Sequence, residues 1–120
     1  MNTKRKKVFI FDDNKDILDL CILILEELDY VVKTSISSNN ISEQVTDFMP
    51  DIILMDNWLP DVGGIVATQE LKNNPDLKHI PVIYFSANNE ISKLAETAGA
   101  DDYLSKPFDI QNLEAILEKY

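Results

Sequence analysis

Short apolar segments alternate along the chain with longer segments in which apolar residues recur at helical spacing. The short segments are Val8–Phe11, Val31–Lys33, Ile52–Met55, Pro81–Phe85 and Tyr103–Leu104. The first, third and fourth are apolar almost throughout rather than alternating, a pattern typical of strands that are covered on both faces. We therefore predict five β-strands, three of which lie inside the molecule.

The longer segments predict five helices. The first has a broad apolar face, with Asp13 or Asn14 at the position of an N-cap. The second follows a loop over residues 35–40 and begins with Asn40, Ser42 and Glu43 in the order of a capping box, and Asp109 is placed to cap the last. The predicted helices cover Asn14–Leu28, residues 41–48, Ile65–Asn73, and the regions around 91–98 and 110–117.

The strict alternation of strand and helix predicts an α/β fold. Parallel strands joined by helices form a sheet with helices on both faces, a doubly wound arrangement. At 120 residues the chain has the size of a single domain, residues 1–120. Ligands of such sheets bind at the carboxyl ends of the strands, so these positions are the first place to look for chemistry.

Charge and composition narrow the possible partners. The formal net charge is −10, which argues against nucleic acid as a direct partner. The one basic run, residues 4–7, is interpreted as a solvated lead-in to the first strand. The stretch Ile17–Leu28 is too short and too charged to span a bilayer. Cys21 is the only cysteine, so an internal disulfide is impossible, and we expect a buried side chain in a cytoplasmic protein.

Acidic, hydroxyl and basic side chains follow the predicted strands. Asp12 and Asp13 end the first strand, Asp56 the third, Ser86 the fourth, and Lys106 follows the fifth. Carboxylates that converge repel one another unless a cation lies among them. Oxygen ligands suit a hard cation such as Mg²⁺, and an ammonium group such as that of Lys106 suits a phosphoryl oxygen.

This set of groups is what phosphoryl transfer requires: neutralisation of charge, positioning, and a nucleophile in line with the transferred group. No histidine is needed as a base if the nucleophile is an ionised carboxylate. Asp56 is the candidate, and it would become an aspartyl phosphate.

Five segments of the chain resemble the motifs of response-regulator receiver domains, in the family's order and over essentially the whole chain. They are Phe11-Asp12-Asp13-Asn14, Ile52–Asp56, Leu59-Pro60 with Gly64, Phe85-Ser86-Ala87, and Gly99–Phe108. The resemblance implies a five-stranded parallel sheet in the flavodoxin-like order 2-1-3-4-5, with five helices on both faces.

The resemblance also implies roles for individual residues. Asp56 is expected to be the phospho-acceptor, and Lys106, preceding a cis Pro107, is expected to contact the phosphoryl group. Ser86 and Tyr103 are the expected switch pair, which changes the surface of the fourth helix, fifth strand and fifth helix. The expected ligands of Mg²⁺ (or Mn²⁺) are Asp12, Asp13, Asp56 and the backbone carbonyl of Trp58.

The implied partners are a histidine kinase or a histidine phosphotransfer protein on one side and a downstream protein target or output domain on the other. The chain is expected to be a monomer or a phosphorylation-induced dimer. It would not be an enzyme in the usual sense, because it would catalyse only its own phosphorylation and dephosphorylation.

Three other functions compete with this interpretation. A flavin carrier with the same fold needs a loop that accepts a phosphate where this chain has Asp12-Asp13-Asn14. An aspartate-nucleophile phosphatase typically has Asp-x-Asp after the first strand, which is missing here. A pseudo-receiver, which acts as an interaction module without phosphorylation, is the alternative that the residues leave open.

Two features have two interpretations each. The ring of Trp58 either screens the acyl phosphate from water or is a partly exposed aromatic without a kinetic role. The apolar face of Ile17–Leu28 is broader than one buried stripe requires. We expect it to serve the core alone, and docking of the helices of a kinase or phosphotransfer protein is the alternative.

Overall fold

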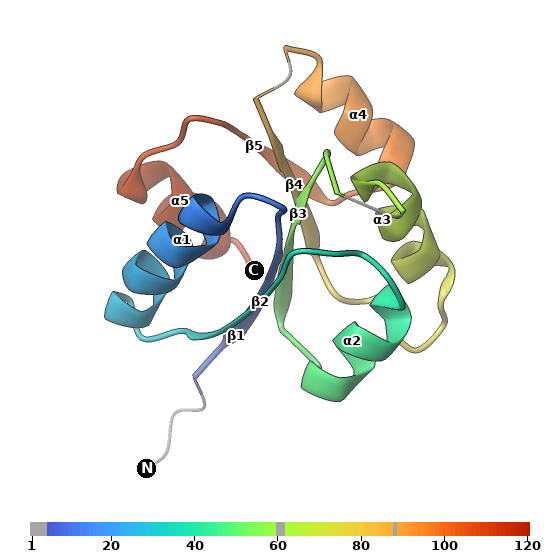
Figure 1. Ribbon diagram of the computed structural model, residues 1–120, viewed down its shortest axis with the longest axis horizontal. Helices are drawn as coiled ribbons and strands as arrows, with labels where there is room; N and C mark the ends of the chain where they lie inside the picture. Colours follow the sequence, from blue (N-terminus) through green and yellow to red (C-terminus); the bar gives the residue numbers. More distant parts are fainter. Residues whose placement is uncertain (1–4, 60–61, 88) are drawn as a thin grey trace.

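The computed structural model describes residues 5–59, 62–87 and 89–120, and within them five strands alternate with five helices (Figure 1). Lys4 of the basic run and Pro60 of the third motif lie outside the described residues. The elements are β1 (Lys7–Phe11), α1 (Lys15–Glu27), β2 (Val31–Ser35), α2 (Ile41–Phe48), β3 (Ile52–Asp56), α3 (Gly64–Asn73), β4 (Val82–Ser86), α4 (Ile91–Ala98), β5 (Asp102–Ser105) and α5 (Ile110–Leu117).

The strands form one parallel sheet in the order β2-β1-β3-β4-β5, as predicted. Helices α1 and α5 cover one face, and α2, α3 and α4 cover the other (Figure 1). The core is accordingly divided into two apolar clusters with the sheet between them. The strand order reverses beside β1, so the carboxyl ends of β1 and β3 border the crevice in which such sheets bind ligands.

The continuous apolar segments form the central strands because both of their faces are covered. Every residue of β3 and of β4 is buried, and in β1 only Lys7 is not. In the edge strand β2 every residue but the exposed Lys33 is half-buried, whereas in β5 Tyr103 and Ser105 are exposed and only Leu104 is buried. Each predicted strand is present, with ends that differ by one or two residues.

Two of the predicted helix caps are confirmed. The side chain of Asn14 accepts hydrogen bonds from the backbone N–H groups of Asp16 and Ile17, and Asp109 accepts one from Asn112. Both side chains satisfy donors that the first turn of a helix leaves unpaired. The direction of α1 away from β1, and hence the position of the residues between them, is set in part by this cap.

The capping box predicted at Asn40 is wrong. Asn40 has a left-handed backbone, with φ of 52°, and its side chain makes no capping hydrogen bond. Asparagine tolerates this conformation better than most residues. The preceding loop is instead tied to α2 by Gln44, whose amide donates to the carbonyls of Ser37 and Asn39. The loop is also shorter than predicted, because β2 continues to Ser35.

Helix α1 buries only part of its apolar face. Leu18, Cys21 and Leu25 are buried against the sheet, which confirms the expected place of the cysteine. Leu20 and Leu23 are 54% and 67% exposed. The expectation that this face serves the core alone is therefore wrong for these two leucines, because more than half of each residue is open to solvent.

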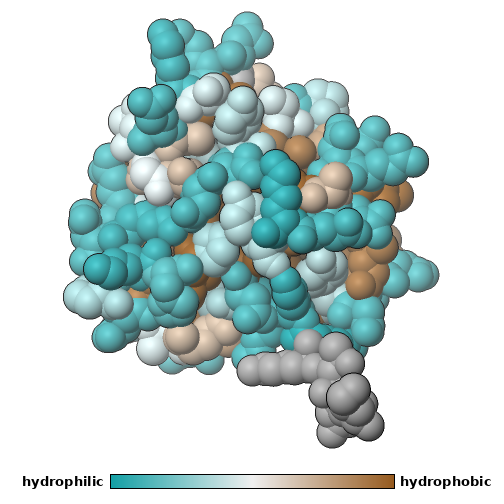
Figure 2. Space-filling view, turned by 180° about the vertical axis from the view of Figure 1, so that it is seen from behind, coloured by the Kyte–Doolittle hydropathy of each residue, from teal (hydrophilic) through white to brown (hydrophobic). Residues whose placement is uncertain are grey.

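The surface seen from behind is mainly hydrophilic, with separate apolar patches (Figure 2). This is in keeping with the acidic composition of the chain. Within the described residues, no helix has the length and apolar character that crossing a membrane requires.

One buried hydroxyl predicts a stabilising substitution. Thr68 of α3 is completely buried, and its Oγ1 has no hydrogen-bond partner among the described residues. Thr68→Val keeps the shape of the side chain and removes the unsatisfied group, so we expect the free energy of unfolding to rise by about 1 kcal/mol. Urea unfolding would show a higher midpoint at an unchanged m-value. The matched control is Thr46→Val on the exposed side of α2, which should change little; a loss of stability in Thr68→Val contradicts the prediction.

Candidate functional site

The predicted site residues meet in a pocket at the carboxyl end of the sheet. The pocket has a volume of about 390 Å³ and contains Asp12, Asp13, Asp56, Ser86 and Lys106. Its other lining residues are Asn14, Ile17, Trp58 and Ala87. Four strand ends therefore bring together groups that lie as much as 94 residues apart in the chain.

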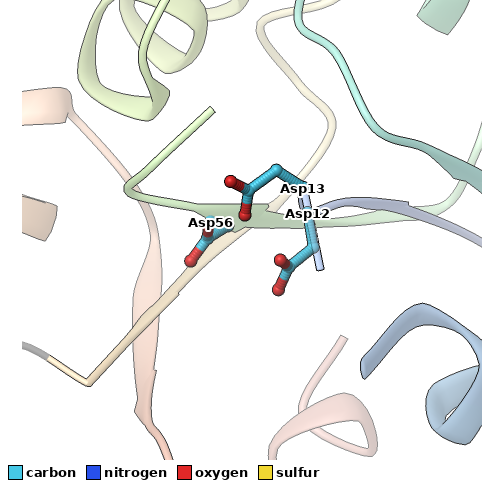
Figure 3. A group of neighbouring side chains, drawn as sticks. All are labelled: Asp12, Asp13 and Asp56. Atoms are coloured by element: carbon cyan, nitrogen blue, oxygen red, sulfur yellow. The ribbon is translucent and has the colours of Figure 1, made fainter. Parts of the chain in front are cut away.

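The acidic part of the pocket comes from two neighbouring strands. Asp12 and Asp13 follow β1, and Asp56 is the last residue of β3 (Figure 3). One carboxylate oxygen from each residue lies within 4.8 Å of the others. Asp12 is fully buried and Asp56 is 4% exposed, whereas Asp13 is open to solvent.

Lys106 supplies the compensating positive charge. Its Nζ lies 2.7 Å from Oδ2 of Asp12 and 3.0 Å from Oδ1 of Asp56. It also lies 4.5 Å above the ring of Phe85, a favourable cation–π position. The backbone N–H of Lys106 donates to the carbonyl of Ser86 at 2.9 Å, which holds the lysine beside β4. The Lys106–Pro107 peptide bond is cis, as the family resemblance implied.

Two features set the pKa values in the pocket: its side chains are buried, and three carboxyl groups lie near one ammonium group. Burial raises the pKa of Asp56, the carboxylates of Asp12 and Asp13 add to that rise, and the hydrogen bond from Lys106 opposes it. Burial alone would lower the pKa of Lys106, but its hydrogen bonds to Asp12 and Asp56 outweigh that effect and raise it. The lysine therefore remains an ammonium group, and one positive charge faces three carboxyl groups.

These residues fit a hard divalent cation. The ligand atoms that converge are carboxylate oxygens, which hard cations prefer. The single lysine does not neutralise three carboxylates, so a bound cation would stabilise the cluster further. The pocket is open on the side of Asp13, so solvent reaches it. Trp58 also lines the pocket and is 72% exposed.

The expected switch residues occupy different environments. Ser86 ends β4, is 2% exposed and lines the pocket. Tyr103 lies on the edge strand β5, paired in register with Tyr84 of β4, and is 44% exposed. The structure therefore places Ser86 in the site and Tyr103 outside it, on the surface between α4 and α5.

Two residues beside the site, Tyr84 and Asn57, and the contact that Gly64 makes there are absent from the prediction. The hydroxyl of Tyr84 donates to Oδ1 of Asn57, and the N–H of Gly64 donates to the Asn57 carbonyl at 3.2 Å. Tyr84 lies within an apolar strand, where the sequence carries no sign of a polar contact. Gly64 had a signal, as the second member of a glycine pair after the acceptor strand, but its contact had not been predicted.

An open parallel sheet in the order 2-1-3-4-5 with five helices is the flavodoxin-like receiver fold. The chain matches the family model of the response regulator receiver domain over residues 8–118. It therefore belongs to the response regulator receiver family, whose members are phosphoryl-accepting signalling domains.

The chain is similar to parts of longer proteins that have different functions. The chain is 32% identical over 111 residues to the DNA-binding dual master transcriptional regulator RpaA of Synechocystis, covering 91% of this chain and 46% of RpaA. It is 30% identical over 107 residues to the CAI-1 autoinducer sensor kinase/phosphatase CqsS of Vibrio cholerae, covering 87% of this chain and 16% of CqsS. The chain thus spans less than half the length of these relatives.

A solved structure has the same fold and a related site. The receiver domain of sensor histidine kinase PA1611 from Pseudomonas aeruginosa superimposes with a TM-score of 0.89 at 27% identity, covering 98% of each chain. That domain was solved with a magnesium ion coordinated in its active-site cleft.

The buried carboxylate of Asp56 predicts a gain in stability on its removal. Because the pKa of Asp56 is higher in the folded than in the unfolded chain, the ionised form opposes folding, and its cost appears as pH rises through the folded pKa. With a metal chelator at pH 7, Asp56→Asn should raise the free energy of unfolding by on the order of 1 kcal/mol. The difference from wild type should narrow as the pH is lowered toward 4.

Chemical unfolding at several pH values measures this difference. The control is Asp76→Asn in the exposed loop before β4, where the loss of one charge should have little effect. If Asp56→Asn is less stable than wild type throughout this pH range, the electrostatic account of the pocket is wrong.

Proposed function

We propose that this chain is a signalling switch that accepts a phosphoryl group on Asp56 with the help of Mg²⁺ or Mn²⁺. The phosphoryl group would come from a histidine kinase or a histidine phosphotransfer protein. The observation that carries the proposal is the setting of the Asp56 carboxylate. It lies at the end of a buried strand, 3.0 Å from the Lys106 ammonium and within 4.8 Å of the carboxylates of Asp12 and Asp13.

In the proposed reaction a carboxylate oxygen of Asp56 attacks the phosphorus of the donor. A P–O bond to Asp56 forms while the P–N bond of the donor phosphohistidine breaks, and the leaving imidazole keeps the electron pair. Lys106 stabilises the negative charge on the transferred oxygens, and the Ser86 hydroxyl donates to one of them. Asp56 needs no general base, because its ionised carboxylate is already the nucleophile.

The proposed cation ligands are Asp12, Asp13, Asp56 and the backbone carbonyl of Trp58. When bound, the cation would supply the positive charge that the three carboxylates and the incoming phosphoryl oxygens require. Asp12 is held for this role by two contacts, one from the backbone N–H of Asn14 at 2.8 Å and one from Lys106 at 2.7 Å.

Phosphorylation would act on the rest of the molecule through charge. A phosphoryl group adds about −1.5 to −2 charges and three strong hydrogen-bond acceptors beside Ser86 and Lys106. The backbone N–H of Lys106 donates to the carbonyl of Ser86, so the ends of β4 and β5 would both lie beside the added negative charge. We propose that the exposed Tyr103 moves inward and that the surface of α4, β5 and α5 changes for a downstream partner or a second copy of the chain. We propose that the chain catalyses only its own phosphorylation and dephosphorylation and that it does so in the cytoplasm.

The exposed part of α1 is the proposed docking surface for the phosphoryl donor. Leu20 borders an apolar hollow of about 230 Å³ next to the site, whose other lining residues are Ile17, Lys106, Pro107 and Phe108. Leu23 extends the apolar surface by one turn. Helices of a kinase or phosphotransfer protein that pack here would place a phosphohistidine beside the pocket.

Titration of Mg²⁺ followed by a phospho-donor tests the proposed function. Trp58 is the only tryptophan and lines the pocket, so we expect a saturable change in its fluorescence with Mg²⁺. Acetyl phosphate should then produce a second change and the mass increase of one phosphoryl group. Asp56→Asn is the control and should show no labelling, because it lacks the nucleophile.

Mg²⁺-dependent labelling that persists in Asp56→Asn would refute the assignment of the acceptor. Absence of both a Mg²⁺ response and a mass increase in the wild-type chain would instead support the pseudo-receiver, an interaction module that works without phosphorylation.

Substitution of Lys106 should separate metal binding from phosphorylation. Lys106→Ala removes the ammonium group near Asp12 and Asp56 but none of the proposed cation ligands, so the Mg²⁺ midpoint should not weaken. The rate of labelling by acetyl phosphate at saturating Mg²⁺ should fall by roughly 10²-fold, because one preorganised charge is lost from the transition state. The control is Lys78→Ala, an exposed lysine before β4. An unchanged labelling rate in Lys106→Ala would show that its ammonium group takes no part in the transfer.

A further inference from the structure

The residue that follows the acceptor is held at both its side chain and its backbone. Oδ1 of Asn57 accepts a hydrogen bond from the hydroxyl of Tyr84, and its carbonyl accepts one from the N–H of Gly64 at 3.2 Å. Gly64 also packs directly on the peptide that joins Asp56 to Asn57. A Cβ atom at position 64 would lie 2.1 Å from the Asp56 carbonyl oxygen, a distance that no side chain can adopt.

Tyr84 is unusual among the residues of β4. It is one of the largest fully buried side chains, and it belongs to the apolar cluster between the sheet and α2, α3 and α4. A phenol hydroxyl in such surroundings is costly unless it is hydrogen-bonded, so its contact with Asn57 is required by burial itself. Burial and the nearby charge of Asp56 raise the pKa of Tyr84, which keeps the hydroxyl proton in place as a donor.

Asn57 lies between the two groups that the proposed reaction needs from this segment. Asp56 provides the nucleophilic carboxylate, and Trp58 provides a backbone carbonyl for the cation. An anchored side chain and an anchored carbonyl at Asn57 restrict the two peptide planes that flank it. The directions of the Asp56 side chain and of the Trp58 carbonyl then depend on a contact made by β4.

We propose that Tyr84 is a positioning residue for the acceptor segment. Its hydroxyl holds Asn57, and through Asn57 it orients Asp56 and the Trp58 carbonyl toward the divalent cation. This inference rests on the proposed function and adds a residue to it. Tyr84 lies two residues before Ser86 and is paired with Tyr103, so the same strand carries the switch hydroxyl and the anchor of the acceptor segment.

The substitution Tyr84→Phe tests the proposal because it removes the hydroxyl alone. The dissociation constant for Mg²⁺, measured by titration of Trp58 fluorescence without a phospho-donor, should increase about three- to tenfold, the range set by the net value of one hydrogen bond. Urea unfolding of both proteins, recorded in parallel, ensures that only folded protein is titrated. Tyr30→Phe is the matched control, because Tyr30 precedes β2 at the opposite end of the sheet, and it should bind Mg²⁺ as wild type does.

A second variant tests whether Tyr84 acts through Asn57. Asn57→Ala should weaken Mg²⁺ binding by a similar factor, and the double variant Tyr84→Phe/Asn57→Ala should bind no more weakly than Asn57→Ala alone. Such non-additivity is the signature of two residues that act through one contact. Additive losses would show that Tyr84 affects the site by another route and would overturn the proposal.

The remaining outcomes separate this inference from the proposed function. If wild type and Tyr84→Phe bind Mg²⁺ equally while Tyr84→Phe is less stable to urea, the hydroxyl serves only the fold, and the inference fails by itself. If the wild-type chain shows neither a Mg²⁺ response nor labelling of Asp56, the proposed function fails and the inference fails with it.

Discussion

The structure depends on one electrostatic constraint: three carboxylates are confined to the edge of a buried sheet, where water cannot screen them fully. Parallel strands end on the same side, so acidic residues that follow β1 and β3 must converge there. Lys106 offsets part of their repulsion from the far end of the chain, at 2.7 Å and 3.0 Å from two of them. The charge that remains uncompensated would favour binding of the proposed cation, and in the metal-free protein the same charge is expected to oppose folding.

Much of this arrangement was accessible from the sequence because it follows from local patterns. Buried parallel strands are recognised by continuous apolar residues, and Asp12, Asp56 and Ser86 stand at the ends of such segments. The predictions that were wrong concern residues whose conformation or exposure depends on contacts between distant parts of the chain. The left-handed backbone at Asn40 is set by the loop and not by its own segment, and helical periodicity does not reveal that Leu20 lies outside the core. The hydrogen bond from Tyr84 could not be predicted for the same reason, since it joins β4 to the residue after β3, and Tyr84 lies within an otherwise apolar segment.

Because the chain belongs to the receiver family, its pocket and its outer surfaces would have different functions. The pocket would determine the chemistry, and the outer surfaces would determine the partners. The proposed acceptor, the proposed cation ligands and the lysine all lie within residues 8–118, which match the family model. The relatives include a DNA-binding regulator and a sensor kinase, both more than twice as long as this chain. Signal specificity would therefore depend on the surfaces around the pocket, where Leu20 and Leu23 of α1 and Tyr103 of β5 are exposed.

The division of the core into two apolar clusters has a consequence for how such a protein can diverge. The cluster under α1 and α5 and the cluster under α2, α3 and α4 are separated by the sheet. Substitutions that reshape the exposed side of α1 for a new donor therefore leave the packing on the opposite face intact. Duplicated copies of the gene could therefore acquire separate upstream partners through α1 while each keeps the same acceptor pocket at the carboxyl end of the sheet.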